Sequence, residues 1–242
     1  MREPTRPATP PPSFLHAYQQ TGAASEGLIR LSAEFDSAAF SPSLFEQCSL
    51  YCPDNIADSI TKRQAEFFAG RWLASQALVQ FGHQNFTVLA DEKRCPLWPA
   101  GTVGSITHSD NQVRCAIGRA SVYQTLGIDI QPSLSEAAAQ KLQRRILSPS
   151  EVQLLASSAL PFAVGVALSF SAKESVYKAL YPIVKRYFGF ACARLVATEA
   201  CAQTLRFTID DELSCLPGCP REVSVRYEYT QEFVYTEVAL SR

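Results

Sequence analysis

The 242-residue sequence predicts an α+β fold made of two similar halves. In the first half, residues 59–80 have the apolar spacing of a helix, and residues 103–117 alternate apolar and polar side chains like an antiparallel hairpin. The same order recurs in the second half, with a helix over residues 170–188 and a hairpin over residues 223–240. We therefore expect two pseudo-symmetric α/β halves, each with a small antiparallel sheet and a long helix.

The expected division is a proline-rich arm at residues 1–12, a first half at residues 13–122 and a second half at residues 123–242. The arm has no apolar segment of the kind found in signal peptides and is typical of a disordered, polyproline-like stretch. The longest apolar stretch, residues 159–168, is far shorter than the ~20 residues that span a bilayer. We expect a cytoplasmic monomer.

The composition excludes several classes of protein. With 47% hydrophobic and 19% charged residues, the chain can bury a core, so a disordered or fibrous protein is excluded. A net charge of −1 offers no general cationic field for nucleic acid or an anionic membrane, so an anionic ligand must meet a local group of bases. The eight cysteines lack the usual zinc-binding spacings, and we expect free thiols.

In the first half, Ser59 is the expected N-cap of the first helix, and Gly82 ends that helix. A basic, proline-containing loop at residues 91–99 then leads to the hairpin, whose turn is Ser109-Asp110-Asn111. His108 is therefore expected at the edge of this turn.

In the second half, residues 126–130 are expected to form a strand. Ser148 and Glu151 have the spacing of a capping box around a proline at the first helical position, so a helix should begin there. The helix at residues 170–188 has the strongest pattern in the sequence, with an apolar stripe that includes Tyr177.

Two carboxylates stand at positions otherwise suited to a core. Asp129 lies between two isoleucines in the strand, and an ionised carboxylate taken out of water needs a partner or a metal ion. Glu174 lies on the apolar stripe of the helix, with Lys178 one turn further on. Two inward carboxylates with nearby lysines suit a Mg²⁺-bound polyphosphate. The alternatives are a buried aspartate held by backbone amides, and a capping box in which Glu174 pairs with Ser171.

Basic side chains in the first half have two interpretations. Arg63 and Arg71 lie about 80° apart around one helix and can reach the same anion, or they form a solvated face. His108 is either an anion contact or a histidine that stabilises its turn. The sequence contains no P-loop, no GxGxxG turn and no GxSxG motif.

Five blocks of residues resemble a known family in both order and spacing. They are KRQAEFFAGR at residues 62–71, PLWP at 96–99, GSITHS at 104–109, GIDI at 127–130 and FSAKESVYKA at 170–179. Together they resemble the 4′-phosphopantetheinyl transferases, of the enterobactin-synthase-component type and the related surfactin type. The match covers roughly residues 59–182, and its last block is highly specific.

The resemblance implies a Mg²⁺-dependent transfer of 4′-phosphopantetheine from coenzyme A to a serine of an acyl or peptidyl carrier protein, in fatty acid, siderophore or nonribosomal peptide synthesis. The active site would lie in a cleft between the halves, and adenosine 3′,5′-bisphosphate would be released. A Mg²⁺-dependent phosphohydrolase and a non-catalytic protein that binds coenzyme A or a carrier remain the alternatives.

The resemblance also implies roles for single residues, each identified by its place in the matching blocks. Asp129 and Glu174 match the metal ligands, and Glu174 is also the candidate base, with Lys178 and His108 in the catalytic set. The family also has residues that contact the phosphates of coenzyme A. Their positions are matched here by Arg63, Arg71, Lys93, Arg94, Thr107, His108, Lys173 and Lys178.

The sequence departs from the family at Gln131, where a glutamate is common two residues after the strand aspartate. A glutamine offers only a neutral amide oxygen, so the metal ion would have two protein carboxylates. For the carrier, the expected docking surface contains Lys141, Arg144 and Arg145, interleaved with apolar residues such as Ile146.

Overall fold

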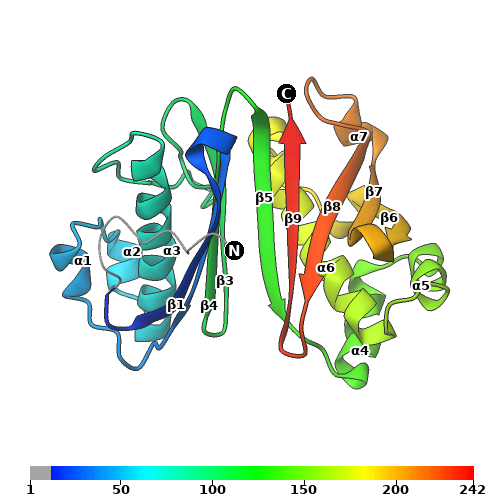
Figure 1. The fold of residues 1–242 in the computed structure, drawn as a ribbon. Helices are drawn as coiled ribbons and strands as arrows, with labels where there is room; N and C mark the ends of the chain where they lie inside the picture. Colours follow the sequence, from blue (N-terminus) through cyan, green and yellow to red (C-terminus); the bar gives the residue numbers. More distant parts are fainter. Residues whose placement is uncertain (1–11) are drawn as a thin grey trace. The chain divides into compact units, whose positions relative to one another are not determined.

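Two antiparallel sheets, each with one long helix against it, organise residues 12–242, the part of the chain that the computed structural model describes (Figure 1). The chain divides into two units. The first ends at Gln124 and also includes Arg242, and the second runs from Thr125 to Ser241. The expected arm at residues 1–12 lies outside the described residues except for Pro12.

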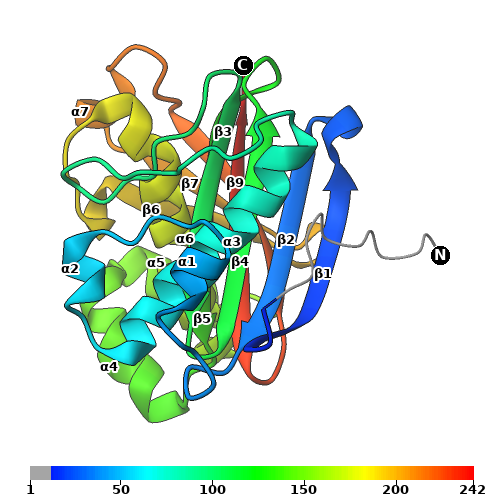
Figure 2. The ribbon, with the colours of Figure 1, turned by 90° about the vertical axis from the view of Figure 1, so that its left-hand side faces the viewer.

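The first unit contains a four-stranded sheet with the order β1-β2-β4-β3. Its strands are β1 (Leu15–Ala23), β2 (Leu28–Phe35), β3 (Thr102–Ser109) and β4 (Gln112–Arg119), and its helices are α1 (Leu44–Gln47), α2 (Asp54–Ala57), α3 (Thr61–Gln80) and the 3₁₀ turn η1 (Ala24–Glu26). Figure 2 shows α3 lying across this sheet. Phe68, Trp72 and Leu73 of α3 are fully or almost fully buried, and their removal from water stabilises the packing of the helix on the sheet.

The second unit contains a five-stranded sheet with the order β5-β9-β8-β7-β6. Its strands are β5 (Tyr123–Pro132), β6 (Ala193–Glu199), β7 (Thr204–Ile209), β8 (Glu222–Tyr229) and β9 (Phe233–Ser241). Its helices are α4 (Glu136–Ile146), α5 (Pro149–Ala156), α6 (Phe162–Val184), α7 (Asp211–Ser214) and the 3₁₀ turns η2 (Phe190–Cys192) and η3 (Ala200–Ala202).

Side-chain and backbone contacts fix the position of helix α6 on its sheet. The hydroxyls of Ser171 and Ser175 lie 2.9 and 2.7 Å from the hydroxyl of the fully buried Thr236 on β9. Gly127 of β5 allows the closest approach, because a Cβ there would overlap the Ser175 carbonyl and meet the Ala179 backbone nitrogen. These contacts hold the part of α6 that follows Ser175 close to β5.

The predicted α+β fold is confirmed, and most of the predicted elements exist. The capping box of Ser148 and Glu151 is present. The cap at Ser59 is wrong: Ile60 occupies the N-cap, and the Ser59 hydroxyl instead donates to the carbonyl of Ile56. The last long helix begins eight residues earlier than predicted, at Phe162, and ends at Val184.

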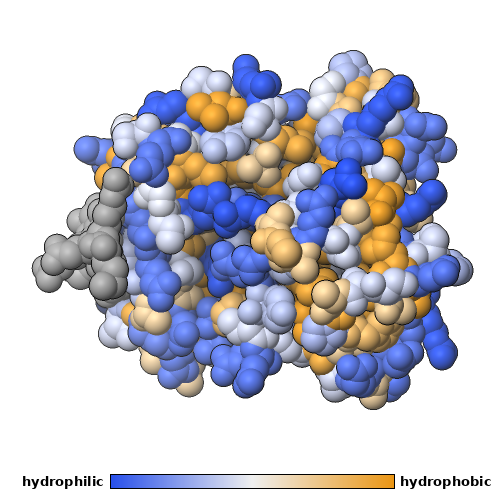
Figure 3. All heavy atoms as spheres, turned by 45° about the vertical axis from the view of Figure 1, so that its right-hand side comes forward, coloured by the Kyte–Doolittle hydropathy of each residue, from blue (hydrophilic) through white to orange (hydrophobic). Residues whose placement is uncertain are grey.

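Figure 3 shows one face of the molecule, on which hydrophilic and hydrophobic residues are interspersed. None of the helices between residues 12 and 242 combines the length and apolar character that a bilayer-spanning segment needs. No disulfide joins the cysteines of residues 12–242.

Candidate active site

A cluster of charged groups in the second unit is formed by β5 and α6. Asp129 points inward from β5 and is buried, because the isoleucines beside it face the opposite side of the strand. Lys178 of α6 donates to Asp129 Oδ1 at 2.7 Å and to the carbonyl of Ile128 at 2.9 Å. Asp129 therefore has the partner that a buried carboxylate needs, and Lys178 is part of the same site.

Glu174 lies one turn before Lys178 on α6 and belongs to this cluster. Burial is the main reason that the pKa of Glu174 is raised above its usual value; the nearby negative charge of Asp129 adds to this and Lys178 opposes it. Because Glu174 lies inside α6 and the Ser171 hydroxyl meets Thr236, a capping box between Ser171 and Glu174 does not form. The two carboxylates are close enough to repel each other, an arrangement that a bound cation would stabilise.

Gln131 lies at the edge of the same cluster. Its side-chain nitrogen donates to Asp129 Oδ2 at 2.8 Å, so the two oxygens of Asp129 are held by different partners. Within residues 12–242, no group of three or more His, Cys, Asp and Glu side chains is placed to hold a metal ion. Two carboxylates and one amide are the protein oxygens that the cluster offers to Mg²⁺, which usually keeps several waters.

A pocket of about 130 Å³ adjoins Glu174 in the second unit. Tyr177 of α6 forms one wall, and the segment of residues 187–193 forms the other. The ring of Tyr177 lies 5.0 Å from that of Phe188 and 5.9 Å from that of the exposed Tyr187. This pocket can take a narrow, partly apolar chain next to Glu174.

A second polar cluster, in the first unit, joins the start of α3 to the end of β3. Arg63 Nη1 lies 3.0 Å from His108 Nε2 and 3.5 Å from Glu66 Oε2, while His108 Nδ1 lies 3.6 Å from the same Glu66 oxygen. Residues three apart on a helix face the same side, so Arg63 and Glu66 both reach the strand. This geometry supports the anion-contact interpretation of His108.

Arg71 lies two turns further along α3 than Arg63. Its guanidinium lies 4.8 Å from the centre of the Phe67 ring, and its Nε is buried with no acceptor in the described part of the chain. Burial lowers the pKa of Arg71 to about 10; the charge of Arg63 acts in the same direction and Cys115 opposes it. A buried cation beside another cation, with an unused donor, is suited to an anionic ligand. Arg71 also lines a hollow of about 650 Å³ between residues 47–51 and 83–88.

Comparisons with known proteins agree with this geometry. Residues 53–118 match the model of the 4′-phosphopantetheinyl transferase N-terminal domain, and residues 125–229 match that of the 4′-phosphopantetheinyl transferase superfamily. Enterobactin synthase component D of Salmonella typhimurium is 40% identical over 82% of this chain and 79% of its own length, and its Salmonella typhi counterpart is 35% identical over the same shares. The 4′-phosphopantetheinyl transferase PptT of Mycobacterium tuberculosis is 34% identical over 63% of this chain and 66% of its own length.

The chain belongs to the 4′-phosphopantetheinyl transferase family. It is therefore an enzyme that transfers 4′-phosphopantetheine from coenzyme A to carrier proteins, as its sequence predicted. This finding supports the transferase over the phosphohydrolase and the non-catalytic protein. The two matched domains contain both polar clusters.

The structure gives Lys173 of this transferase a different environment from the one that the resemblance implied. Its side chain is buried, and its ammonium donates to Glu151 Oε1 at 2.8 Å and to the carbonyls of Ile146 and Phe190 at 2.7 and 3.1 Å. These three acceptors match the three donors of an ammonium. This placement favours a structural role for Lys173 over a contact to coenzyme A.

Other implied phosphate contacts of the transferase differ in their placement. Thr107 is buried, and its side chain faces the opposite side of β3 from His108, because strand residues alternate. The two side chains therefore leave β3 on opposite faces, and Thr107 is the more buried of the two. Lys93 and Arg94 are exposed on a loop shaped by Asp91, whose carboxylate accepts from the backbone amides of Lys93 and Cys95 at 2.9 Å.

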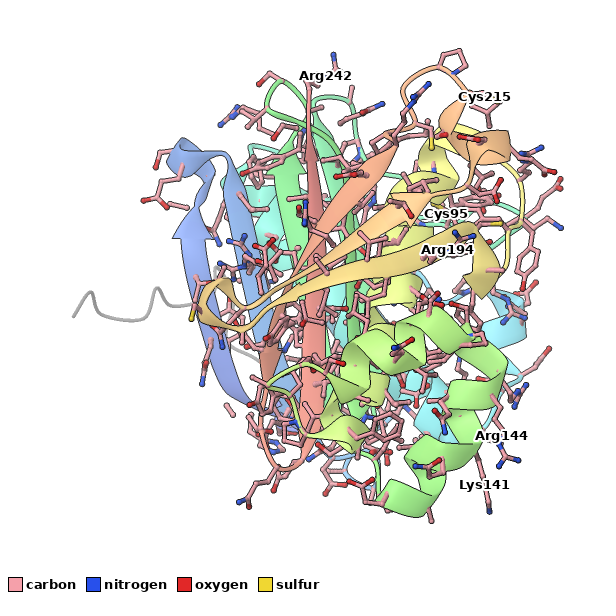
Figure 4. All side chains as sticks on the ribbon, turned by 90° about the vertical axis from the view of Figure 1, so that its right-hand side faces the viewer. Cys95, Lys141, Arg144, Arg194, Cys215 and Arg242 are labelled. Carbon is pink, nitrogen blue, oxygen red and sulfur yellow. The ribbon has the colours of Figure 1, made fainter. Side chains whose placement is uncertain are left out.

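The basic residues that were expected to dock the carrier lie on the exposed side of α4. Lys141, Arg144 and Arg145 are exposed, and Figure 4 shows Lys141 and Arg144 pointing away from the helix into solvent. Of the two apolar residues expected to cover an apolar spot on the partner, Ile146 or Leu147, Ile146 belongs to the core and is not available. Leu147 is partly buried and keeps some exposed surface.

The sequence analysis did not identify two acidic residues that pair with predicted site residues. Glu66 lies in the recognised block at residues 62–71, and its spacing of three from Arg63 was the available signal. Glu151 was interpreted only as a capping residue. No local signal could pair it with Lys173, because the two lie 22 positions apart and meet through the tertiary fold.

Proposed function

We propose that this enzyme is a Mg²⁺-dependent transferase that places 4′-phosphopantetheine on a serine of a peptidyl or acyl carrier and releases adenosine 3′,5′-bisphosphate. The observation that carries the proposal is the cluster of Asp129, Glu174 and Lys178, in which two inward carboxylates and one lysine from β5 and α6 converge. Two relatives are named as enterobactin synthase components, which supports carrier domains of a siderophore or other nonribosomal peptide synthase as acceptors. We expect it to act in the cytoplasm as a monomer.

Asp129 and Glu174 would hold the Mg²⁺ through carboxylate oxygens, and Gln131 would offer its amide oxygen if its side chain turned over. When bound, the ion neutralises charge on the pyrophosphate of the donor. Lys178 has a flexible stem and 29% exposure of its side chain, so its ammonium can leave Asp129 for a phosphate oxygen. Lys178 would then stabilise the charge that grows on the leaving phosphate.

Glu174 would act as the general base, directly or through one water. In this step the serine hydroxyl oxygen forms a bond to the β-phosphorus, and the bond from that phosphorus to the bridging oxygen breaks. The bridging oxygen leaves with the electron pair as part of adenosine 3′,5′-bisphosphate, and the serine proton passes to Glu174. The pocket between Tyr177 and Phe188 lies beside Glu174 and would hold the pantetheine arm.

The basic groups of the first unit would bind the adenosine part of coenzyme A. Arg63 and His108 form the proposed site of the 3′-phosphate, and Arg71 supplies a further buried cation with a free donor. Lys93 and Arg94 are exposed and would add mobile positive charge around the phosphates.

The decisive experiment incubates the protein with an apo carrier, Mg²⁺ and coenzyme A, and weighs the carrier by mass spectrometry. A gain of one phosphopantetheine, with release of adenosine 3′,5′-bisphosphate, is expected. Asp129→Asn and Glu174→Gln keep the size of the side chains and should each abolish transfer while the circular dichroism spectrum stays native. Peptidyl and fatty-acid acyl carriers tested side by side would identify the acceptor. Full activity in the presence of EDTA would overturn the metal dependence.

A further inference from the structure

The proposed function leaves Glu66 without a role, although this side chain lies between Arg63 and His108. A single oxygen, Oε2, faces both partners, at 3.5 Å from Arg63 Nη1 and 3.6 Å from His108 Nδ1. The Glu66 side chain is 14% exposed, against 38% for Arg63 and 31% for His108. Glu66 is therefore the inner member of the cluster, behind the two groups that a ligand can reach.

The two nitrogens of His108 have different neighbours. Nδ1 faces the carboxylate of Glu66, while Nε2 faces the Arg63 guanidinium at 3.0 Å. A neighbouring negative charge favours a proton on Nδ1, which fixes the orientation of the ring and leaves Nε2 for the outward partner. Because a guanidinium can only donate, Nε2 accepts from Arg63 in the structure. When Arg63 turns to a bound anion, a proton taken up on Nε2 would let the imidazolium donate to that anion while Nδ1 remains next to Glu66.

The cluster rests on a fixed part of α3. The buried side chain of Gln64 donates to the carbonyls of Ala57 and Ser59 at 2.9 and 2.8 Å, which ties the first turn of the helix to the preceding segment. Arg63 and Glu66, both from α3, are charged groups that face His108, and its cross-strand neighbour on β4 is the apolar Val113. Glu66 thus places a negative charge next to this imidazole.

We propose that Glu66 is a positioning residue that orients His108 and favours its protonated form, so that the site prefers a donor with a 3′-phosphate. This inference rests on the proposed function, in which Arg63 and His108 bind that phosphate. Because Glu66 acts through His108, its contribution should be absent for a donor that lacks the 3′-phosphate.

The test compares coenzyme A with dephospho-coenzyme A as donors for wild type and Glu66→Gln. We expect Glu66→Gln to raise the KM for coenzyme A roughly tenfold, the effect of losing about one charge-assisted contact. The kcat and the KM for dephospho-coenzyme A should stay unchanged. In wild type the KM for coenzyme A should rise with pH as the imidazolium loses its proton, and in Glu66→Gln this rise should begin at lower pH.

Glu34→Gln is the matched control, because Glu34 Oε2 lies 3.3 Å from His16 Nε2 in a more exposed pair of the same unit. It should leave both KM values and the pH profile unchanged. Equal changes with both donors would mean that Glu66 only stabilises the fold, and a lower KM for coenzyme A would mean that Glu66 competes with the phosphate. Either result overturns the inference while transfer by wild type still supports the proposed function. No transfer by wild type would overturn the proposed function itself.

Discussion

Replacing Lys173 with methionine tests whether this lysine holds the second unit together or binds substrate. Methionine is similar in length and apolar, so the variant removes the ammonium without leaving a large cavity. The change leaves the Glu151 carboxylate buried without its cation and leaves the carbonyls of Ile146 and Phe190 without their donor. Four elements lose a shared contact, because these partners lie on α4, α5 and the segment at η2, while Lys173 lies on α6.

The size of the effect follows from the burial of the pair. Breaking a buried ion pair by removing one partner costs about 3–5 kcal/mol, because the other charge stays out of water. Glu151 keeps three other hydrogen bonds, from the backbone and hydroxyl of Ser148 at 2.7 and 2.8 Å and from the Leu195 amide at 2.8 Å, so we expect the lower end, about 3 kcal/mol. Glu151→Gln removes the charge and keeps one of the two accepting oxygens, so it is the second single variant that breaks this pair.

Urea unfolding followed by circular dichroism measures this loss. Lys173→Met should lower the unfolding midpoint, and the double variant with Glu151→Gln should be less destabilised than the sum of the single variants, because each single change removes the same contact. At low urea, where the variant is folded, the KM for coenzyme A should stay within about twofold of wild type, since this lysine is proposed to make no phosphate contact. An unchanged midpoint together with a large rise in that KM would refute the structural role and restore Lys173 to the coenzyme site.

The pair of Lys173 and Glu151 also predicts that the protein becomes less stable at acidic pH. Burial alone would raise the pKa of Glu151, but the hydrogen bonds from Lys173, Ser148 and Leu195 outweigh it and hold the pKa below its usual value. A depressed folded-state pKa contributes stability that is present above the unfolded pKa of about 4.3 and is lost as the pH falls through the folded value. Unfolding free energies measured below pH 5 should fall less steeply in Glu151→Gln than in wild type, and parallel curves would contradict this.

Three further substitutions test single contacts. Gln131→Ala should reduce transfer less than Asp129→Ala, and Gln131→Glu should be tolerated; a Gln131→Ala variant as inactive as Asp129→Ala would make the amide an essential ligand. His108→Ala should raise the KM for coenzyme A and change that for dephospho-coenzyme A little, because the contact is remote from the reacting phosphorus, and an equal loss of kcat/KM with both donors would remove His108 from the 3′-phosphate site. The double change of Arg144 and Arg145 to glutamate should raise the KM for the carrier several-fold and flatten its salt dependence, whereas an unchanged carrier KM at low salt would move the docking surface elsewhere.

Local patterns in the sequence were sufficient to predict the two hairpins and the presence of a long helix in each half. Alternation along residues 103–117 is a short-range property, and the turn residues around Asp110 restrict the register. The start of α6 could not be predicted in the same way, because residues 162–169 lack a polar face. That stretch is buried on most sides, and burial on all sides removes the periodicity that marks a surface helix. Strand β1 was missed because its burial pattern does not alternate cleanly around the bulge between His16 and Gln19.

The sequence alone predicted the family and the transferase reaction, because motif order can be recognised without a structure. It also pointed to the residue types of the proposed site, through the cost of burying Asp129. The tertiary structure decided which of the two α6 lysines lies beside Asp129. Lys173 and Lys178 lie five positions apart, about 140° around the helix, and the sequence does not say which side another element fills. Glu151 and two carbonyls occupy the side of Lys173, whereas Asp129 of β5 lies on the side of Lys178. A side chain whose donors are all used by the protein has none left for a substrate, and only packing determines which side chain that is.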